Sequence, residues 1–381
     1  MQRPFLLYLG AIITLVGCIS YFGWDRTWSA VFVPPVSPPF VDMRVIQAAA
    51  ISATQGLNPQ ISNPNDSGGT PLNYPLIWVK IGQALNLPNE SRFIQFCSLI
   101  VLCFVGCCGY ILYRFPSFKL LVCLLSTATL LGIERGNIDL IMYSLVFLFA
   151  LVIPKKLSSV PILVATALKL YPVFALGVLL IKRQFRLFFA SLIIALAIFV
   201  YLWNELAVIR SNTPAAFDVS YGFPSLAVYF SSRNLPSWMF VGLATIICSI
   251  IFVTALYLRN MEGIRRHQDR LEFNLFLAGA SIYVGTFIFA SNFDYRLMFL
   301  IFCVPFLEAR RFPFDGLLVI LIIVAMNWLI VVPLFVMDPL LGIARFVIWF
   351  AKIAVFIGLS AYLAVLVLDI FEREQPRLVG A

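Results

Sequence analysis

The sequence predicts an all-α membrane protein, a polytopic bundle of about 11–12 membrane segments in which some helices are broken or re-entrant. Hydrophobic residues make up 61% of the 381 residues and charged residues only 12%, which is too apolar for one water-soluble core. Apolar runs of about 17 residues or more, long enough to span a hydrocarbon core of about 30 Å, recur along the chain. We therefore expect one transmembrane domain over residues 1–381.

The expected membrane segments follow one another closely, apart from one long polar stretch near the N-terminus. They are residues 5–23, 93–113, 117–133, 138–153, 185–203, 237–258, 272–292, 296–309, 315–336 and 350–369, together with the ambiguous segment 157–181. The polar stretch, Trp24–Arg92, is predicted to be a long first outer loop that carries short helices at the membrane surface. We call it the first loop.

A candidate catalytic carboxylate lies in the first loop. Asp42 follows the proline-rich run 34–39, which is not helical throughout, and we expect it to open a helix that Gly56 ends. An acidic residue in the first turn of a helix is electrostatically favoured. Asp42 is therefore either a catalytic group or a plain helix-start residue. Arg44 lies only two positions on and need not face it.

The segment 157–181 decides the topology. A single crossing would place the basic clusters before and after the segment on opposite faces of the membrane. A break near Lys169, with a return of the chain, would place them on the same face. Pro172 favours the break because proline removes a helix hydrogen bond. The alternative is one kinked crossing whose lysine snorkels to the interface. In the broken arrangement both termini are cytoplasmic, in a bacterial inner membrane, together with the clusters at 155–156, 182–186, 259–270, 310–311 and 373–377.

The chain lacks the residues that several kinds of catalytic and metal-binding site require. His267 is the only histidine and lies in a basic connector, which excludes a Ser-His-Asp triad and a histidine metal site. The eight cysteines have no paired loop spacing, and the chain contains neither a Gly-rich phosphate loop nor an Asp-x-Asp pair. We expect no metal and no cofactor. The net charge of +9 is explained by the inner basic clusters and requires no nucleic acid.

An ordered set of short motifs runs through residues 1–210. The set is an aspartate before a short helix, a Gly-x-x-Pro turn, a Tyr-Pro element, a Gly-Asn turn and a Lys-x-x-Pro break, here Asp42, Gly56–Pro59, Tyr74–Pro75, Gly136–Asn137 and Lys169–Pro172. This order resembles the membrane-embedded glycosyltransferases of the C fold class, in particular the polyprenyl-phosphate-mannose-dependent mannosyltransferases of glycosyltransferase family 87. Residues 211–381 carry a weaker echo at 291–296. Leu76 and Asn292 depart from the pattern, since related sequences often have proline there.

The resemblance implies transfer of a sugar, with mannose the commonest in the family, from a polyprenyl-phosphate-linked donor to a hydroxyl of a lipid or glycan acceptor. The transfer would occur on the outer, periplasmic face, with inversion at the anomeric carbon. Asp42 would be the general base. Lys169 and Arg296, with Arg135 as a third cation, would bind the donor phosphate.

Four further residues have both a functional and a structural interpretation. As functional residues they would contact the sugar or the acceptor or orient the cations, and they are Glu134, Asn137, Tyr74 and Asp294. As structural residues, Glu134 would pair with a nearby cation and Asn137 would cap the next helix. Tyr74 would belong to the interfacial aromatic belt, where we also expect Trp24, Trp28 and Trp78. Asp294 would pair with Arg296.

Two other functional classes stay open at this point. A transporter or flippase of lipid-linked sugars would also carry broken helices and cavity-facing charges. Such transporters often show repeated halves, whereas the Lys-x-x-Pro break and the long first loop each occur once. A catalytically silent scaffold is less favoured, because charges inside a membrane are costly to keep.

Overall fold

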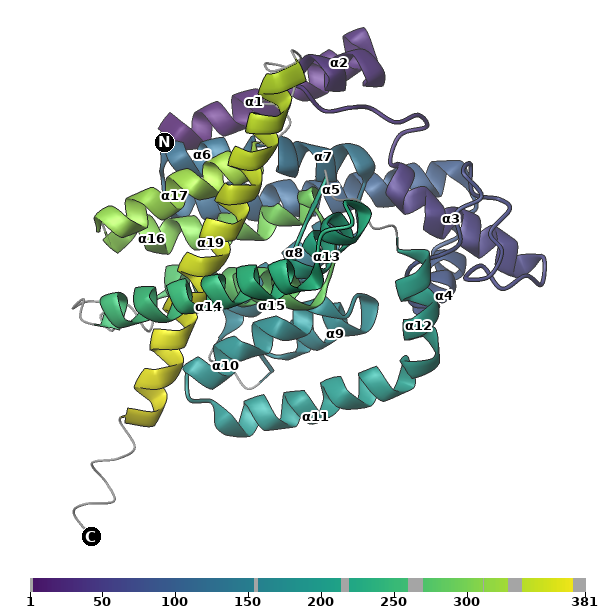
Figure 1. The fold of residues 1–381 in the computed structure, drawn as a ribbon. Coiled ribbons are helices and arrows are strands. Elements are labelled where there is room, and N and C mark those ends of the chain that lie inside the picture. Colours follow the sequence, from purple (N-terminus) through teal and green to yellow (C-terminus); the bar gives the residue numbers. More distant parts are fainter. Residues whose placement is uncertain are drawn as a thin grey trace. The chain divides into compact units, whose positions relative to one another are not determined.

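The computed structural model describes residues 3–153, 157–213, 219–259, 270–310, 312–327 and 338–372, with only the backbone described at 338–344 and 371–372. In these ranges the chain is almost wholly helical, as predicted (Figure 1). It divides into two compact units. Unit 1 comprises Met1–Phe149, Val160–Val173 and Ile193–Pro214, and unit 2 comprises Ala150–Ser159, Phe174–Leu192 and Ala215–Ala381.

Five helices in the described ranges are long and apolar enough to cross a membrane. They are α1 (Arg3–Phe22), α5 (Glu90–Arg114), α14 (Ser237–Arg259), α15 (Leu271–Phe289) and residues 345–370 of α19 (Asp338–Glu372). Two bent sets of helices bring the total to seven if each is one span. The polytopic helical bundle is thus confirmed, and several of its predicted spans are built from shorter pieces.

The first bent set consists of α6 (Phe118–Leu124) and α7 (Thr127–Arg135), followed by α8 (Asp139–Val152). The chain turns by 116° between α7 and α8. The second is α11 (Phe185–Tyr201) with α12 (Trp203–Asn212), which bends by 70°. The predicted segments 117–133 and 138–153 therefore meet at a sharp turn, and the Gly-Asn motif lies in it.

The first loop of unit 1 contains three short helices, as predicted: α2 (Trp24–Ala30), α3 (Val41–Thr54) and α4 (Ile77–Ala84). Helix α3 ends close to Gly56, which has a φ of +81°. The prediction that Trp28 and Trp78 belong to the interfacial aromatic belt is wrong. Trp28 is 0% exposed and Trp78 is 1% exposed, so they pack inside the protein and do not form an interfacial belt.

The break near Lys169 is confirmed. Helix α9 (Val160–Leu168) ends one residue before the lysine, a 3-10 helix η1 (Tyr171–Leu176) follows, and α10 (Gly177–Ile181) continues the segment. The carbonyl of Leu168 accepts a hydrogen bond from Trp78 Nε1 at 2.9 Å, which ties the end of α9 to α4. Pro172 lies inside η1, where an α-helical hydrogen bond is not required. The return of the chain to the same face stays a prediction.

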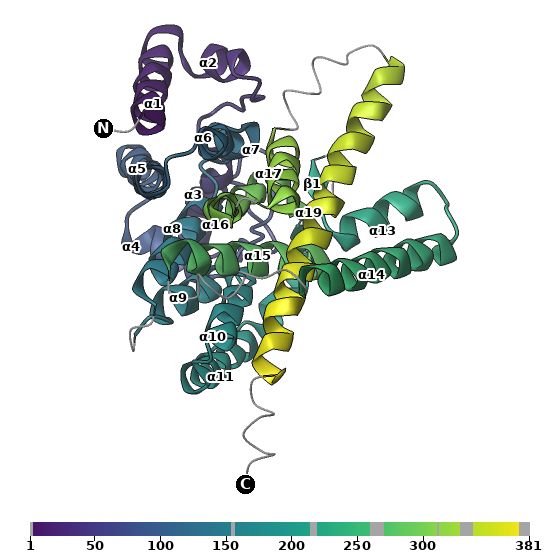
Figure 2. The same cartoon turned by 90° about the vertical axis from the view of Figure 1, so that its left-hand side faces the viewer.

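Unit 2 is built around α15, most of whose residues are buried. The long helix α19, yellow in Figures 1 and 2, packs against α14, α15 and α17 (Pro313–Met326). Helix α15 also packs closely on the 3-10 helix η3 (Asp294–Cys303), which leads into α16 (Val304–Arg310). The predicted span 296–309 is therefore largely a 3-10 helix. Segments β1 (Ser220–Tyr221) and β2 (Asn292–Phe293) pair antiparallel, and α13 (Phe223–Ser232) follows β1.

Much of the charge pattern that predicted the topology falls outside the described residues. This applies to Lys155, Lys156, residues 260–269 with His267, Arg311 and residues 373–377. Arg183 is described, and it donates to the carbonyls of Asp369 and Ile370 at 3.3 and 3.2 Å. An arginine at the C-terminal end of a helix satisfies free carbonyls there. The orientation of the chain in a membrane stays a prediction.

Candidate functional site

Asp42 lies in the first turn of α3, as the sequence predicted. The proline-rich run delivers the chain to Phe40, whose φ of +64° is in the left-handed region. The carbonyl of Phe40 then accepts from the backbone N–H groups of Met43 and Arg44, which starts the helix. The carboxylate of Asp42 thus projects from a helix N-terminus, where the backbone dipoles favour a negative charge.

The two oxygens of the Asp42 carboxylate have different surroundings. Asn137 Nδ2 donates to Asp42 Oδ2 at 2.5 Å. Within the part of the chain that the structure describes, Oδ1 makes no hydrogen bond. Asp42 is half-buried, so this second oxygen is positioned to accept a hydrogen bond from a bound molecule.

Charged neighbours and burial act on Asp42 in opposite directions. Burial is the largest influence and raises its pKa above the ordinary value, because a charge is less stable away from water. The hydrogen bond from Asn137 and the positive charges of Arg135 and Lys169 lower the pKa. Asp139 raises it further by like-charge repulsion. The net result is a carboxylate that is a stronger base than an exposed aspartate.

Arg44 does not engage Asp42. Its guanidinium donates to both carboxylate oxygens of Glu90, at 3.1 and 2.6 Å, and its Nε donates to the carbonyl of Pro39 at 2.9 Å. This bidentate pair ties α3 to the start of α5. The arginine therefore leaves Asp42 available, as the sequence spacing allowed.

The turn between α7 and α8 holds the partner of Asp42. Gly136 has a φ of +59°, and a Cβ atom placed on it would lie 2.7 Å from the Cβ of Phe40. Only glycine fits this close contact between the turn and the first loop. Asn137 Oδ1 accepts from the backbone N–H of Asp139 at 2.8 Å, so Asn137 caps α8 as predicted and also binds Asp42.

Glu134 and Arg135 fasten the proline-rich run to α7. Glu134 is fully buried, and its Oε1 accepts from the backbone N–H of Val36 at 2.8 Å and from Trp24 Nε1 at 3.3 Å. Arg135 lies 3.2 Å from Glu134 Oε2 and donates to the carbonyl of Pro34 at 3.3 Å. The predicted pairing of Glu134 with a cation is confirmed. Contacts of these residues with a sugar or a phosphate stay predictions.

Lys169 has a buried partner. Its Nζ donates to Asp139 Oδ1 at 2.6 Å, and the hydroxyl of Tyr171 donates to the same oxygen at 2.9 Å. Asp139 is fully buried, whereas 13% of the Lys169 side chain is exposed. The ion pair accounts for a lysine inside an apolar segment, because such a charge requires a partner or a wet surface.

Tyr74 lies beneath the lysine. Its ring centroid is 5.1 Å from Lys169 Nζ, within the range of a cation–π contact, and the residue is 7% exposed. The carbonyl of Tyr74 accepts from Gln60 Nε2 at 3.1 Å. Glu205 of α12 accepts from the same Gln60 amide at 3.3 Å and from the backbone N–H of Leu76 at 2.8 Å. Tyr74 is thus held within unit 1 and, like Trp78, is not a belt residue.

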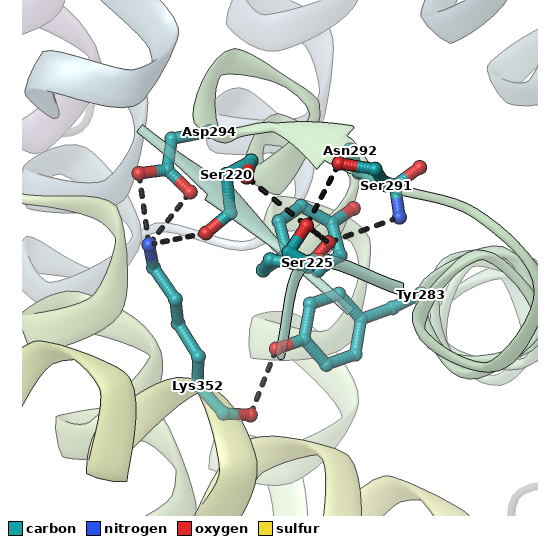
Figure 3. A network of polar contacts seen from close by, with 8 residues as sticks. Ser220, Ser225, Tyr283, Ser291, Asn292, Asp294 and Lys352 are labelled. Carbon is teal, nitrogen blue, oxygen red and sulfur yellow. Dashed lines mark hydrogen bonds and ion pairs between the residues drawn. The ribbon is translucent and has the colours of Figure 1, made fainter. Parts of the chain in front are cut away.

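The two remaining predicted site residues, Asp294 and Arg296, belong to unit 2. Asp294 is fully buried, and Lys352 Nζ of α19 lies 2.7 and 2.8 Å from its two carboxylate oxygens (Figure 3). Lys352 also donates to the carbonyl of Ser220 at 3.3 Å. Asp294 thus has an ion-pair partner from the C-terminal helix, and its predicted pairing with Arg296 stays a prediction.

Arg296 is oriented by Asn292, the residue that departs from the family pattern. Arg296 Nη1 donates to Asn292 Oδ1. The amide nitrogen of Asn292 donates to the carbonyls of Thr286 and Ala290 at 2.8 and 2.9 Å. These bonds fix the side chain, so its oxygen faces the arginine. Arg296 itself is 8% exposed.

A small polar network surrounds the paired strands β1 and β2. The hydroxyl of Ser225 lies 3.0 Å from that of Ser220 and 2.8 Å from that of Ser291, while the Tyr283 hydroxyl donates to the carbonyl of Lys352 at 2.9 Å (Figure 3). Gly222, with a φ of +116°, lets β1 pass so close to the carbonyl of Ala290 that a Cβ would lie 2.4 Å from it. The network holds β1 and β2 together inside unit 2.

Among the described residues, no group of three or more His, Cys, Asp or Glu side chains is arranged to hold a metal ion. The polar groups of unit 1 include the carboxylate of Asp42, the amide of Asn137 that binds it and the ammonium of Lys169 that is paired with Asp139. A model of glycosyltransferase family 87 matches residues 76–291, which is more than half of the chain. The chain belongs to glycosyltransferase family 87. No curated protein and no solved structure matches it.

Membership in glycosyltransferase family 87 favours the transferase over the transporter and the silent scaffold. The match includes the turn between α7 and α8 and the break at Lys169. The predicted site residues outside it are Asp42, Tyr74, Asp294 and Arg296. The family assignment and the geometry around Asp42 are therefore separate observations.

Sequence reasoning missed two charged residues of this family 87 chain, Asp139 and Lys352. Each is the buried partner of a residue that had been singled out, Lys169 and Asp294 respectively. The signal that could have found them is the cost of an unpaired charge in an apolar segment. Asp139 stood next to the Gly-Asn turn, and Lys352 stood inside the apolar segment 350–369.

Proposed function

We propose that this glycosyltransferase moves a sugar, mannose being the first candidate, from a polyprenyl-phosphate-linked donor to a hydroxyl group of a lipid or glycan acceptor. The observation that supports this best is the Asp42 carboxylate, whose Oδ2 is held by Asn137 while Oδ1 has no partner among the described residues. A general base requires this combination of a fixed position and a free oxygen.

In the proposed reaction, Asp42 Oδ1 takes the proton of the acceptor hydroxyl. The acceptor oxygen attacks the anomeric carbon, and the bond from that carbon to the phosphate oxygen breaks. The electron pair of the broken bond stays on the oxygen, so polyprenyl phosphate is the second product. A single displacement inverts the configuration at the anomeric carbon. No covalent intermediate is involved, and no cofactor is required by these steps.

The cations of the site would stabilise the phosphate as its negative charge grows. Lys169 supplies an ammonium that is paired with Asp139, on a side chain that is 13% exposed. Arg135 is anchored to Glu134 and Pro34. The assignment of Arg296 to the donor phosphate rests on the sequence resemblance alone. Charge-assisted hydrogen bonds to phosphate are the strongest that these side chains form.

The proposed site faces the outer, periplasmic side of a bacterial inner membrane. Its support is the sequence pattern, in which the basic connectors gather on one side of the helices and the first loop lies on the other. A lipid-linked donor stays anchored in the bilayer, so a carboxylate in a loop next to the first membrane helix lies at a suitable depth. The acceptor would be a membrane lipid or a glycan at that surface.

The test is transfer of radiolabelled sugar from synthetic polyprenyl-phosphate donors to a membrane lipid extract. Purified wild type is compared with Asp42→Asn and with Asp25→Asn as the matched control. Asp25 is an exposed aspartate of the same loop that accepts a hydrogen bond from Ser37. Transfer by wild type and Asp25→Asn that Asp42→Asn lacks would support the proposal. Normal turnover by folded Asp42→Asn would refute the base assignment.

A further inference from the structure

We propose that Asp139 is a positioning residue of the transfer reaction, which holds the Lys169 ammonium at a fixed distance from the Asp42 base. This inference rests on the proposed function, because it assigns a task to a residue behind the same site. Asp139 does not touch the reacting atoms in this proposal. It acts through Lys169 and through Asn137.

The side chain of Asp139 leaves Lys169 little choice of position. The carboxylate is fully buried, and an unpaired charge at such a place is strongly unfavourable. Its Oδ1 lies 2.6 Å from Lys169 Nζ and 2.9 Å from the hydroxyl of Tyr171. A lysine side chain has many rotamers in water. Here the ion pair selects one direction for the side chain.

The aromatic rings around the lysine complete the restriction. The centroids of Tyr74 and Tyr171 lie 5.1 and 5.8 Å from Lys169 Nζ, so the ammonium is close to two rings as well as to the carboxylate. Cations are attracted to the faces of aromatic rings. The side chain still has 13% of its surface exposed, and in this proposal the donor phosphate approaches it there.

The backbone of Asp139 fixes the base from the other side. Its N–H donates to Asn137 Oδ1 at 2.8 Å, and Asn137 Nδ2 in turn donates to Asp42 Oδ2. Asp139 therefore orients two groups. Its backbone orients the Asn137 amide that holds Asp42, and its side chain orients the Lys169 ammonium. In a displacement the base and the leaving-group cation act at the same moment, so their separation must be fixed beforehand.

The decisive variant is Asp139→Asn, which keeps the shape and removes the charge. Asp315→Asn is the matched control, since Asp315 is also a fully buried aspartate beside one cation, with Arg310 Nε at 3.4 Å, and also accepts from a tyrosine, Tyr362. We expect Asp139→Asn to lower kcat/KM for the donor about 100-fold, the scale for displacement of a catalytic group by about 1 Å. Asp315→Asn should keep the wild-type value. Gel filtration and unfolding temperature of both variants show that they are folded.

A double-mutant cycle separates positioning from a general structural role. In a Lys169→Met background, the charge of Asp139 has no ammonium to place, so adding Asp139→Asn should cost little more. Losses in the two single variants that multiply in the double variant would overturn the proposal. Unchanged donor kinetics of Asp139→Asn, with an active wild type, would also overturn it. If wild type transfers no sugar from any polyprenyl-phosphate donor, the proposed function fails together with this inference.

A second measurement does not depend on turnover. Reductive methylation with formaldehyde and cyanoborohydride as the hydride donor modifies only the unprotonated amine, and mass spectrometry of the Lys169 peptide gives its rate. Loss of the carboxylate should make methylation of Lys169 faster in Asp139→Asn, with no change in Asp315→Asn. Equal rates in wild type and Asp139→Asn would show that the aspartate does not hold the lysine.

Discussion

Replacement of Gly136 by alanine tests the link between the first loop and the turn that carries Asn137. Gly136 has a φ of +59°, and a Cβ at this position would lie 2.7 Å from the Cβ and 2.9 Å from the Cδ1 of Phe40. The left-handed conformation costs an L-residue about 1–2 kcal/mol. Excess volume at a packed contact costs about 1–3 kcal/mol more. We therefore expect Gly136→Ala to lose about 2–5 kcal/mol of unfolding free energy.

The matched control is Gly69→Ala. Gly69 has a φ of +62°, almost the same as Gly136, but nothing lies within 4 Å of the position of its Cβ. It should therefore show only the conformational cost of about 1–2 kcal/mol. The difference between the two variants isolates the contact with Phe40.

The measurement is equilibrium unfolding in mixed micelles, followed by the donor-transfer assay on the folded fraction. If the two glycine variants lose the same stability, Phe40 does not press on the turn and the reasoning is wrong. We also expect Gly136→Ala to lose transfer activity beyond its folded fraction, because relief of the contact moves Asn137 away from Asp42. Full activity per folded molecule would refute that part.

Three other predictions concern charge. Asp42→Asn should unfold at a higher temperature than wild type at neutral pH. Burial raises the pKa of Asp42 in the folded protein, so the stability of wild type falls as the pH rises above the unfolded-state pKa. The advantage of Asp42→Asn should therefore vanish at low pH, where Asp42 is protonated in both states. Lys169→Gln removes a charge that lowers this pKa, so the acidic limb of kcat/KM should move to higher pH, with Arg135 and Glu134 still in place; an unmoved limb contradicts it. Lys352→Met should cost about 3–5 kcal/mol of unfolding free energy by leaving Asp294 unpaired, and adding Asp294→Asn should return much of it.

The elements that follow from local chemistry were predictable from the sequence. The helix predicted from Asp42 to Gly56 is present as α3. The prolines before it do not form a helix, so the helix begins after them, and Gly56 permits the turn that ends it. The break at Lys169 appears for the same kind of reason, since Pro172 has no N–H to donate. The membrane class followed from composition alone. Each of these features depends on residues close together in the chain.

The pairings between distant residues were not predictable in the same way. Asp139 and Lys169 are 30 positions apart and Asp294 and Lys352 are 58 apart, so their contacts depend on how helices pack. Trp28 and Trp78 were assigned to the membrane interface because tryptophan is common there. Both are buried against neighbouring elements instead. An apolar residue type does not distinguish a lipid-facing surface from a protein-facing one.

The polar residues of unit 1 form one connected chain from the Asp42 carboxylate to the Lys169 ammonium. Asp42 is bound by Asn137, Asn137 by the backbone of Asp139, and the side chain of Asp139 by Lys169. The Asp42 carboxylate lies at one end and the ammonium of Lys169, whose side chain is 13% exposed, at the other. In the proposed reaction a proton is lost at one point and a phosphate is released at another, which requires a fixed separation between the two groups. A chain of short contacts provides it even though two of its members lie in a loop and at a helix break.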